Sequence, residues 1–238
     1  MTKRQNRKMS VLFAGLFLVL GLMFGAVSTQ AATLSLLDYA QVNYAKNISL
    51  PMTNHNWRIK FTNLNKASSA TVSSSNPEVA TIAAYNNSLK GGCVYVTPHE
   101  KGKTTLTVAF SFKSSTGAIV NRNYTVNLTV YGWINPVKTV KVGKTNHASK
   151  FARTNISAGT KLCQGRALIY VVPKSGWTLK GLYVQGLRKS GSSYAYQRLK
   201  LGNKKVLDFR KYVGSPDIYI QVYSAAKKMN LTLLLSGD

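Results

Sequence analysis

The sequence predicts an all-β protein in which an N-terminal signal peptide precedes two β-domains. Three observations predict this class. Apolar and polar residues alternate at period two in many short stretches, as they do in antiparallel sheets that bury one face. Clusters of Gly, Asn, Ser and Pro separate these stretches at short intervals. Beyond the N-terminal segment, no stretch keeps helical periodicity for three turns.

The first 31 residues have the three-part layout of a secretory signal peptide. A basic start, Lys3 to Lys8, precedes an uncharged apolar run of 17 residues, Val11 to Val27. Thr29 and Ala31 then supply small residues for cleavage near Ala31 or Ala32. This layout predicts an extracellular or cell-surface protein that meets the membrane only during export. Retention as a membrane anchor is the alternative, since a spanning helix needs about 20 apolar residues.

About 207 residues follow the signal peptide, which is enough for two domains of about 100 residues each. Gly132 and Asn135-Pro136 form a short joint between them, and we predict domains at residues 34–131 and 132–238. In the first, Trp57 to Phe61 alternates as a half-buried strand does. Two longer strands follow, with Leu106, Val108, Phe110 and Phe112 on the inner face of one and Tyr124, Val126, Leu128 and Val130 on that of the other.

The stretch from Ser73 to Ile82 reads Ser-Ser-Ser-Asn-Pro-Glu-Val-Ala-Thr-Ile. Pro77 fixes its own φ and keeps Asn76 out of the helical region, so the pair predicts a turn that enters a strand beginning at Val79. Two further motifs follow in order, Gly92-x-Val-x-Val-Thr97 and Gly102-x-Thr-x-Leu-Thr-Val108. Together these three elements resemble the bacterial Ig-like domain, group 2, over residues 34–131. The resemblance implies an extracellular β-sandwich and no particular ligand.

The second domain lacks the Asn-Pro element, although Val137–Val142 is similar to the opening strand of another Ig-like unit. We predict a second sandwich or barrel there, with strands at 167–172, 177–185, 194–201, 205–209, 217–223 and 229–235. Gly202-Asn203 predicts a hairpin turn. The apolar face switches near Gly181, which predicts a β-bulge.

Carboxylates are too few and too scattered for acid–base catalysis, which needs two of them, or one with a base, at a single substrate. The acids are Asp38, Glu78, Glu100, Asp208, Asp217 and Asp238. Basic residues surround Asp208, which favours charge compensation. His55, His99 and His147 are isolated from each other and from acids, so no metal site is indicated. We therefore expect neither a cofactor nor an enzyme.

The two cysteines, Cys93 and Cys163, lie in different predicted domains, and we expect them to be unpaired. Thr160-Lys-Leu-Cys163 with Arg166 faintly resembles the active-site strand of sortases, which are cysteine transpeptidases. The order of residues around Cys163 differs from that family, and Arg166 and His147 are too near in sequence. Transpeptidase activity is therefore the least favoured function.

Basic charge is concentrated in the second domain, where 19 Lys and Arg face three acids, against nine and three in residues 34–131. Such a field attracts polyanions. Alternation places Tyr194, Tyr196, Arg198 and Lys200 on one strand face. We predict a polyanion-binding surface made of Tyr194, Tyr196, Arg198, Lys200, Lys204, Lys205, Arg210 and Lys211.

The sequence thus favours a secreted or cell-surface binding and adhesion module without enzymatic activity. Its expected partner is an anionic polysaccharide or wall polymer of the bacterial envelope or a host surface. Two alternatives remain: a structural or adhesive protein that binds another protein, and an extracellular nucleic-acid binder. The second is less favoured because no nucleic-acid motif is present.

Overall fold

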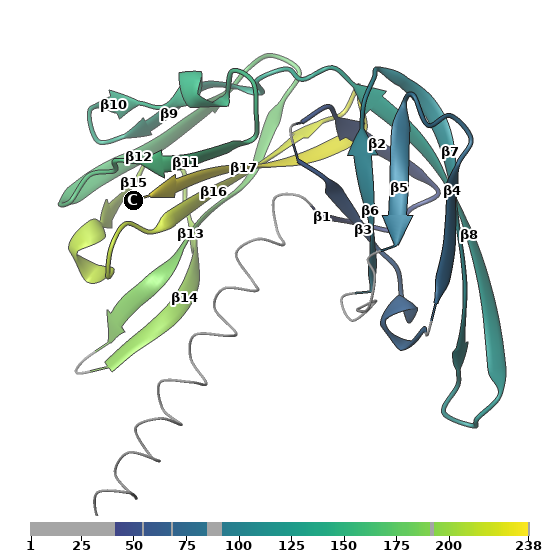
Figure 1. Ribbon diagram of the computed structural model, residues 1–238. Coiled ribbons are helices and arrows are strands. Elements are labelled where there is room, and N and C mark those ends of the chain that lie inside the picture. Colours follow the sequence, from purple (N-terminus) through teal and green to yellow (C-terminus); the bar gives the residue numbers. More distant parts are fainter. Residues whose placement is uncertain (1–40, 54, 68, 85–91, 191–192, 238) are drawn as a thin grey trace, which may run out of the picture. The chain divides into compact units, whose positions relative to one another are not determined.

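A computed structural model describes residues 41–237 apart from residues 54, 68, 85–91, 191 and 192 (Figure 1). The signal peptide predicted at residues 1–31 lies outside the described residues. The described part is all-β, as predicted, with short 3-10 turns and no α-helix. None of its helices is long and apolar enough to span a membrane.

Residues 41–131 contribute two four-stranded sheets among the described residues. One has the order β1-β3-β6-β5 and the other the order β2-β8-β7-β4. The bounds are β1 (Gln41–Asn43), β2 (Asn47–Pro51), β3 (Trp57–Lys60), η1 (Leu64–Lys66), β4 (Ala70–Ser74), β5 (Ala80–Ala84), β6 (Cys93–Pro98), β7 (Gly102–Lys113) and β8 (Ile119–Tyr131).

The predicted alternation in this half is confirmed. Leu106 and Val108 of β7 are 0% exposed, and Phe110 and Phe112 are 6% and 9% exposed. Val126, Leu128 and Val130 of β8 are buried as well. The two strands pair along their whole length from Gly102↔Val130 to Lys113↔Ile119, so that their apolar faces coincide.

The Asn-Pro turn is also confirmed, although β5 begins at Ala80, one residue later than expected. The Asn76 side chain accepts a hydrogen bond from the Glu78 amide at 3.1 Å and holds the turn. Thr104 of β7, which is 5% exposed, accepts from the Asn76 amide at 2.9 Å. Its hydroxyl also lies 2.9 Å from that of Ser74. A hydroxyl of the third motif thus fixes the turn of the first.

Residues 137–237 contribute two more sheets among the described residues, with orders β10-β9-β12-β15 and β11-β17-β16-β13-β14. Figure 1 shows them as two layers. The bounds are β9 (Val137–Val142), β10 (Thr145–Asn146), η3 (Ala148–Phe151), β11 (Ile156–Thr160), β12 (Arg166–Pro173), β13 (Thr178–Ser190), β14 (Ser193–Leu201), β15 (Lys205–Asp208), η4 (Phe209–Lys211), β16 (Asp217–Ser224) and β17 (Met229–Gly237).

Every strand predicted in this half is present, and β10 and β11 are additional ones. The bulge is confirmed, because the register between β13 and β16 shifts between Leu179 and Gly181. After this shift, the buried residues Leu182 and Val184 of β13 pair with the buried residues Ile220 and Ile218 of β16. Neither Cys93 nor Cys163 forms a disulfide in the described chain.

The hairpin predicted at Gly202-Asn203 is wrong. β14 pairs with β13 in the five-stranded sheet, whereas β15 pairs with β12 in the four-stranded one, so the turn between them crosses from sheet to sheet. The Asn203 side chain bonds the backbone of Val171 on β12 instead of closing a hairpin. Lys204 completes the crossing with a left-handed φ of 59°.

Candidate functional site

The eight residues of the predicted polyanion surface lie on one continuous segment, β14–β15–η4. This segment runs from the five-stranded sheet of the second half to the four-stranded one. The structure divides them into three groups. Tyr194, Tyr196, Arg198 and Lys200 share one face of β14. Lys204 and Lys205 lie at the crossing, and Arg210 and Lys211 lie in η4. All six basic side chains are exposed.

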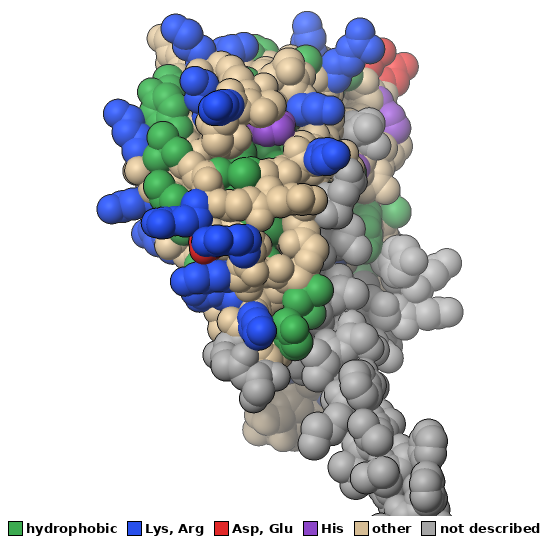
Figure 2. Space-filling model, turned by 90° about the vertical axis from the view of Figure 1, so that its left-hand side faces the viewer, with side chains coloured by type: hydrophobic (Ala, Val, Ile, Leu, Met, Phe, Trp, Pro, Cys, Tyr) green, Lys and Arg blue, Asp and Glu red, His purple; other side chains and the backbone are tan. Residues whose placement is uncertain are grey.

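Figure 2 shows Lys and Arg side chains spread over the visible face, with very few acidic ones. Arg198 packs against two aromatic rings. Its guanidinium lies 4.7 Å from the ring centre of Tyr183 on β13 and 4.9 Å from that of Tyr219 on β16. Tyr219 is completely buried, so Arg198 covers an aromatic surface. Burial lowers the pKa of Arg198, and Tyr219 offsets this shift in part.

The two tyrosines of β14 differ in their surroundings. Tyr194 is 52% exposed, and its ring is available to a planar ligand group. The Tyr196 hydroxyl accepts a hydrogen bond at 2.7 Å from the side-chain amide of Gln185, which is 3% exposed. This bond fixes the ring of Tyr196 against the sheet.

A cavity of about 430 Å³ lies where β14, β15 and η4 meet. Its walls are Arg166, Arg188, Leu199, Val206, Leu207, Asp208, Arg210, Lys211 and Tyr212. Arg210 and Lys211 of the predicted surface are therefore brought together with two arginines, one from β12 and one from β13. Four basic side chains and one carboxylate line this cavity, and opposite charges attract, so an anion is the ligand it suits.

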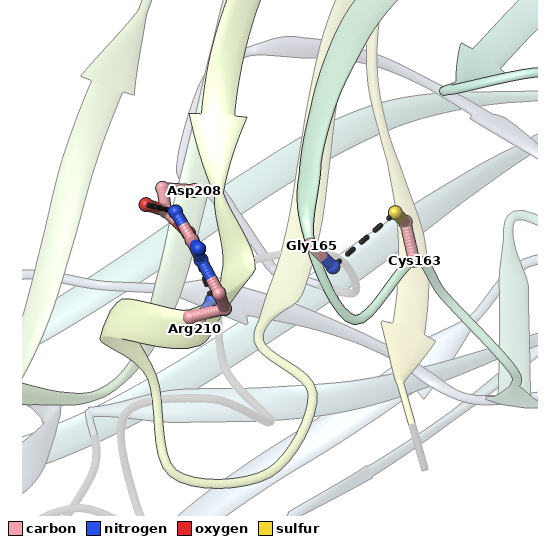
Figure 3. Close-up of polar contacts among 4 residues, drawn as sticks. All are labelled: Cys163, Gly165, Asp208 and Arg210. Carbon is pink, nitrogen blue, oxygen red and sulfur yellow. Dashed lines mark hydrogen bonds and ion pairs between the residues drawn. The ribbon is translucent and has the colours of Figure 1, made fainter.

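The single acid of the cavity is engaged by its neighbour (Figure 3). Arg210 donates from Nε to Oδ1 and from Nη2 to Oδ2 of Asp208, each at 2.8 Å. The Arg210 side chain lowers the pKa of Asp208 to about 2, so the carboxylate stays charged and bound to it. The sequence prediction that Asp208 compensates nearby charge agrees with this geometry. Within the described residues, no acidic side chain forms an ion pair with Arg166, Arg188 or Lys211.

Tyr212 lines the cavity together with Arg188, with which it makes a β-bridge. The side chain is 8% exposed. Its hydroxyl is buried and has no hydrogen-bond partner in the described part of the chain. Burial raises the pKa of Tyr212, and the charge of Arg188 lowers it in part, so the phenol keeps its proton at neutral pH.

Three members of this cavity were missed by the sequence prediction: Arg166, Arg188 and Tyr212. Arg166 was considered only as part of the transpeptidase pattern, and Arg188 and Tyr212 were not singled out as site residues. The three residues are separated in sequence. Arg166 of β12 and Arg188 of β13 belong to different sheets, and they meet only where these two sheets both border the cavity. A local pattern gives no sign of such a meeting.

The transpeptidase pattern does not assemble in the described residues. Cys163 Sγ accepts a hydrogen bond from the Gly165 amide at 3.4 Å (Figure 3), and no histidine or arginine bonds it among the described contacts. His147 is 6% exposed, and burial lowers its pKa. Thiolate activation needs a base or a cation in contact with the sulfur. In addition, the described residues contain no cluster of three or more His, Cys, Asp or Glu that would hold a metal.

No protein-family model matches the chain, and no curated protein matches it. Among solved structures it is similar to parts of the surface layer protein SbsC. Domains 4–9 of SbsC match at 13% identity with a TM-score of 0.28, over 82% of this chain and 30% of that one. Domains 1–6 match at 12% identity with a TM-score of 0.29, over 82% of this chain and 25% of that one.

Domains 5–6 of SbsC match at 13% identity with a TM-score of 0.27, over 81% of this chain and 94% of that one. The chain thus spans less than a third of the two longer SbsC structures. Similarity at these TM-scores carries no argument about what the chain does.

Proposed function

We propose that the chain is an exported, non-enzymatic surface module whose second half binds anionic polymers of a cell envelope or host surface. The N-terminal charge and hydropathy pattern supports export. The first half, with its resemblance to bacterial Ig-like domains, would serve as a spacer and interaction module. The second half would carry the binding surface.

The observation that carries this proposal is the unbalanced charge of the second half, 19 Lys and Arg against three acids. Both described acids there are already occupied. Asp208 is bound by Arg210, and Asp217 accepts a hydrogen bond from Ser236 at 2.7 Å. Burial raises the pKa of Asp217, which makes it a weaker source of negative charge. The basic field is therefore neutralised mainly from outside the chain.

The distribution of the basic groups favours an extended ligand. Arg198 and Lys200 lie on the outer face of β14, Lys204 and Lys205 at the sheet crossing, and Lys211 in the cavity wall. Groups spread over three elements engage several charges of one polymer at once. Exposed Tyr194 adds a surface on which a sugar ring or a base stacks.

The test is a titration of the mature chain with teichoic acid, heparin and duplex DNA between 50 and 200 mM salt. Binding should weaken as salt rises, because the polymer releases condensed counterions; for duplex DNA the log–log slope is about −0.9 per neutralised phosphate. The polymer that binds most tightly identifies the class of partner. Binding that does not depend on salt, or no binding to any of them at low salt, contradicts the proposal.

A matched pair of variants locates the binding surface. Changing Lys200, Lys205 and Lys211 to Gln removes three charges from the second half and should flatten the slope. The control changes Lys60, Lys103 and Lys113 to Gln, which are exposed residues of the first half. Both variants lose the same charge, so equal slopes would show that net charge alone, and no particular surface, accounts for binding.

A protein partner is the alternative, and β14 is the observation that favours it. This strand ends the order of its sheet, so one backbone edge is available for an added strand. Arg198 and Lys200 oppose such pairing, as charges on edge strands do. A partner that adds a strand would bind through main-chain hydrogen bonds and would depend little on salt.

A further inference from the structure

The hydroxyl of Tyr212 is the most unusual polar group of the basic cavity. The side chain is 8% exposed, and within the described chain its oxygen has no hydrogen-bond partner. Buried side-chain oxygens without a partner are rare in native proteins, and each calls for an explanation. A ligand group that bonds this oxygen is one such explanation, because Tyr212 lies in the wall of the cavity.

The cations around Tyr212 point to the charge of that ligand. Arg166, Arg188 and Lys211 come from β12, β13 and η4, and no acid pairs with them in the described residues. Within the described part of the chain, the Arg188 side chain makes a single hydrogen bond, a long one of 3.4 Å to the Gln197 amide oxygen. A guanidinium presents a planar fork of donors that matches two oxygens of a phosphate or a carboxylate.

The composition of the walls favours phosphate over carboxylate. Three cations and a phenol donor exceed what a single carboxylate charge requires. A phosphate ester carries up to two negative charges and up to three terminal oxygens, enough to engage all of these groups. Arg210 is not counted here, because Asp208 already binds it.

The size of the cavity argues for more than a bare ion. Its volume of about 430 Å³ lies within the range of about 300 to 1,000 Å³ found for small-molecule sites. Leu199, Val206 and Leu207 form an apolar wall beside the charged one. Such a wall suits the carbon skeleton of a small organic group attached to the phosphate.

We propose that this cavity binds the phosphate group of a phosphorylated sugar or polyol, with Arg166, Arg188 and Lys211 on its oxygens and the Tyr212 hydroxyl as a further donor. The inference rests on the proposed binding of anionic polymers and narrows it to polymers that bear phosphate monoesters as side or end groups, because a phosphate that links two repeat units keeps only one negative charge and two terminal oxygens. The outer face of β14 then supplies general attraction, and the cavity selects the phosphate group.

The experiment uses the mature chain and glycerol 3-phosphate as the small probe, with glycerate as the carboxylate control, followed by calorimetry or amide shifts. Tyr212→Phe should weaken the binding of glycerol 3-phosphate about fivefold, the worth of one hydrogen bond. It should not lower the melting temperature, because the lost hydroxyl has no partner in the described residues. Arg188→Gln and Arg166→Gln should each weaken binding about tenfold or more.

Lys103→Gln is the matched control, since it removes one charge from an exposed position of the first half, outside the basic surface. It should leave the binding of glycerol 3-phosphate unchanged. If Tyr212→Phe and Arg188→Gln bind glycerol 3-phosphate as the parent chain does, or if glycerate binds as tightly, the phosphate site is wrong even where polymers still bind. If neither polymers nor glycerol 3-phosphate bind, the proposed function fails as well.

Discussion

Arg198 shows what sequence alternation determines at a single residue and what it leaves out. The pattern of β14 correctly predicts which face of the strand carries this side chain and that it is exposed. It contains no information on the rings of Tyr183 and Tyr219, which arrive from two other strands and lie within 5 Å of the guanidinium. A residue expected to serve binding alone therefore also serves packing.

Arg198→Ala should lower the free energy of unfolding by about 1 kcal/mol, since a guanidinium over an aromatic face contributes about 0.5 to 2 kcal/mol. Lys200→Ala, two residues along the same face, should change it by less than about 0.5 kcal/mol. Urea melts of both variants measure the difference. Equal stabilities would mean that the stacked guanidinium contributes binding charge and no stability.

His55 provides a test of stability against pH. Burial lowers its pKa from 6.5 to about 4, and its ring lies 5.4 Å from that of Trp57. Between these two pH values the unfolded chain binds a proton that the folded chain does not, so stability rises with pH across this window. The contribution is complete above pH 6.5 and is lost as the pH falls to about 4.

Ring-proton shifts of His55 should therefore titrate near pH 4 in the folded protein. Urea melts at pH 7, 5.5 and 4.5 should show falling stability, and His55→Gln should reduce that fall. A folded-state titration near pH 6.5 would show that the ring is accessible to water.

At the scale of elements, the strands with strong alternation are predicted correctly and the non-local pairings are not. β7, β8 and β16 carry their apolar residues at every second position, a pattern fixed by the strand itself. β11 reads Ile-Ser-Ala-Gly-Thr and has no such pattern. It is a strand because its backbone pairs with β17, more than 70 residues away. The basic cavity was missed for the same reason, since its walls come from five separate elements.

The crossing at Asn203 depends on a side chain that substitutes for a strand backbone. In the register that pairs Ile169 with Lys205, residue 203 lies opposite Val171. There the Asn203 side chain accepts from the Val171 amide and donates to the Val171 carbonyl, both at 2.9 Å. The side-chain amide of Asn203 thus adds one more pair of hydrogen bonds to the β12 backbone, just before β15 begins.

Asn203→Ala should destabilise the protein by about 1 to 3 kcal/mol, because both polar groups of Val171, a residue that is 1% exposed, lose their partner. Asn203→Asp keeps the acceptor but sets a carboxylate oxygen against the Val171 carbonyl oxygen, so it should cost at least as much. Thermal melts of the two variants rank them. A loss below about 0.5 kcal/mol for Asn203→Ala would show that the crossing holds without this contact.

At the scale of the molecule, each described sheet takes its strands from one side of residues 132–136. Trp133 already belongs to the second side, since its indole donates to the Phe151 carbonyl at 3.0 Å. Asn135 likewise bonds the Ala148 carbonyl at 2.9 Å. The division into domains at residue 132 stays a prediction, with a boundary that these contacts place before Trp133.

Fragments that end at Tyr131 and begin at Trp133 should therefore each give a dispersed amide spectrum, because each keeps all the sheet partners of its strands. Spectra of the separate halves, compared with that of the whole mature chain, measure this. A second half that folds only when joined to the first would mean that the two depend on a shared core.

The parallel pairing of β2 with β8 determines how the first half resists a force that pulls on the two ends of the chain. β2 follows the short β1 near the start of this half, the chain leaves at the end of β8, and the pairs from Asn47↔Asn127 to Pro51↔Tyr131 run in the same direction. Tension along the chain therefore loads the hydrogen bonds of all these pairs at once and in shear. A hairpin pulled from its open end would instead break one pair at a time. Backbone bonds at both ends of the pair, from Asn127 to Lys46 and from Met52 to Tyr131, share the load at 2.7 Å each. A chain held at one end and bound to a polymer at the other would transmit force through a clamp that yields only when the whole pair breaks.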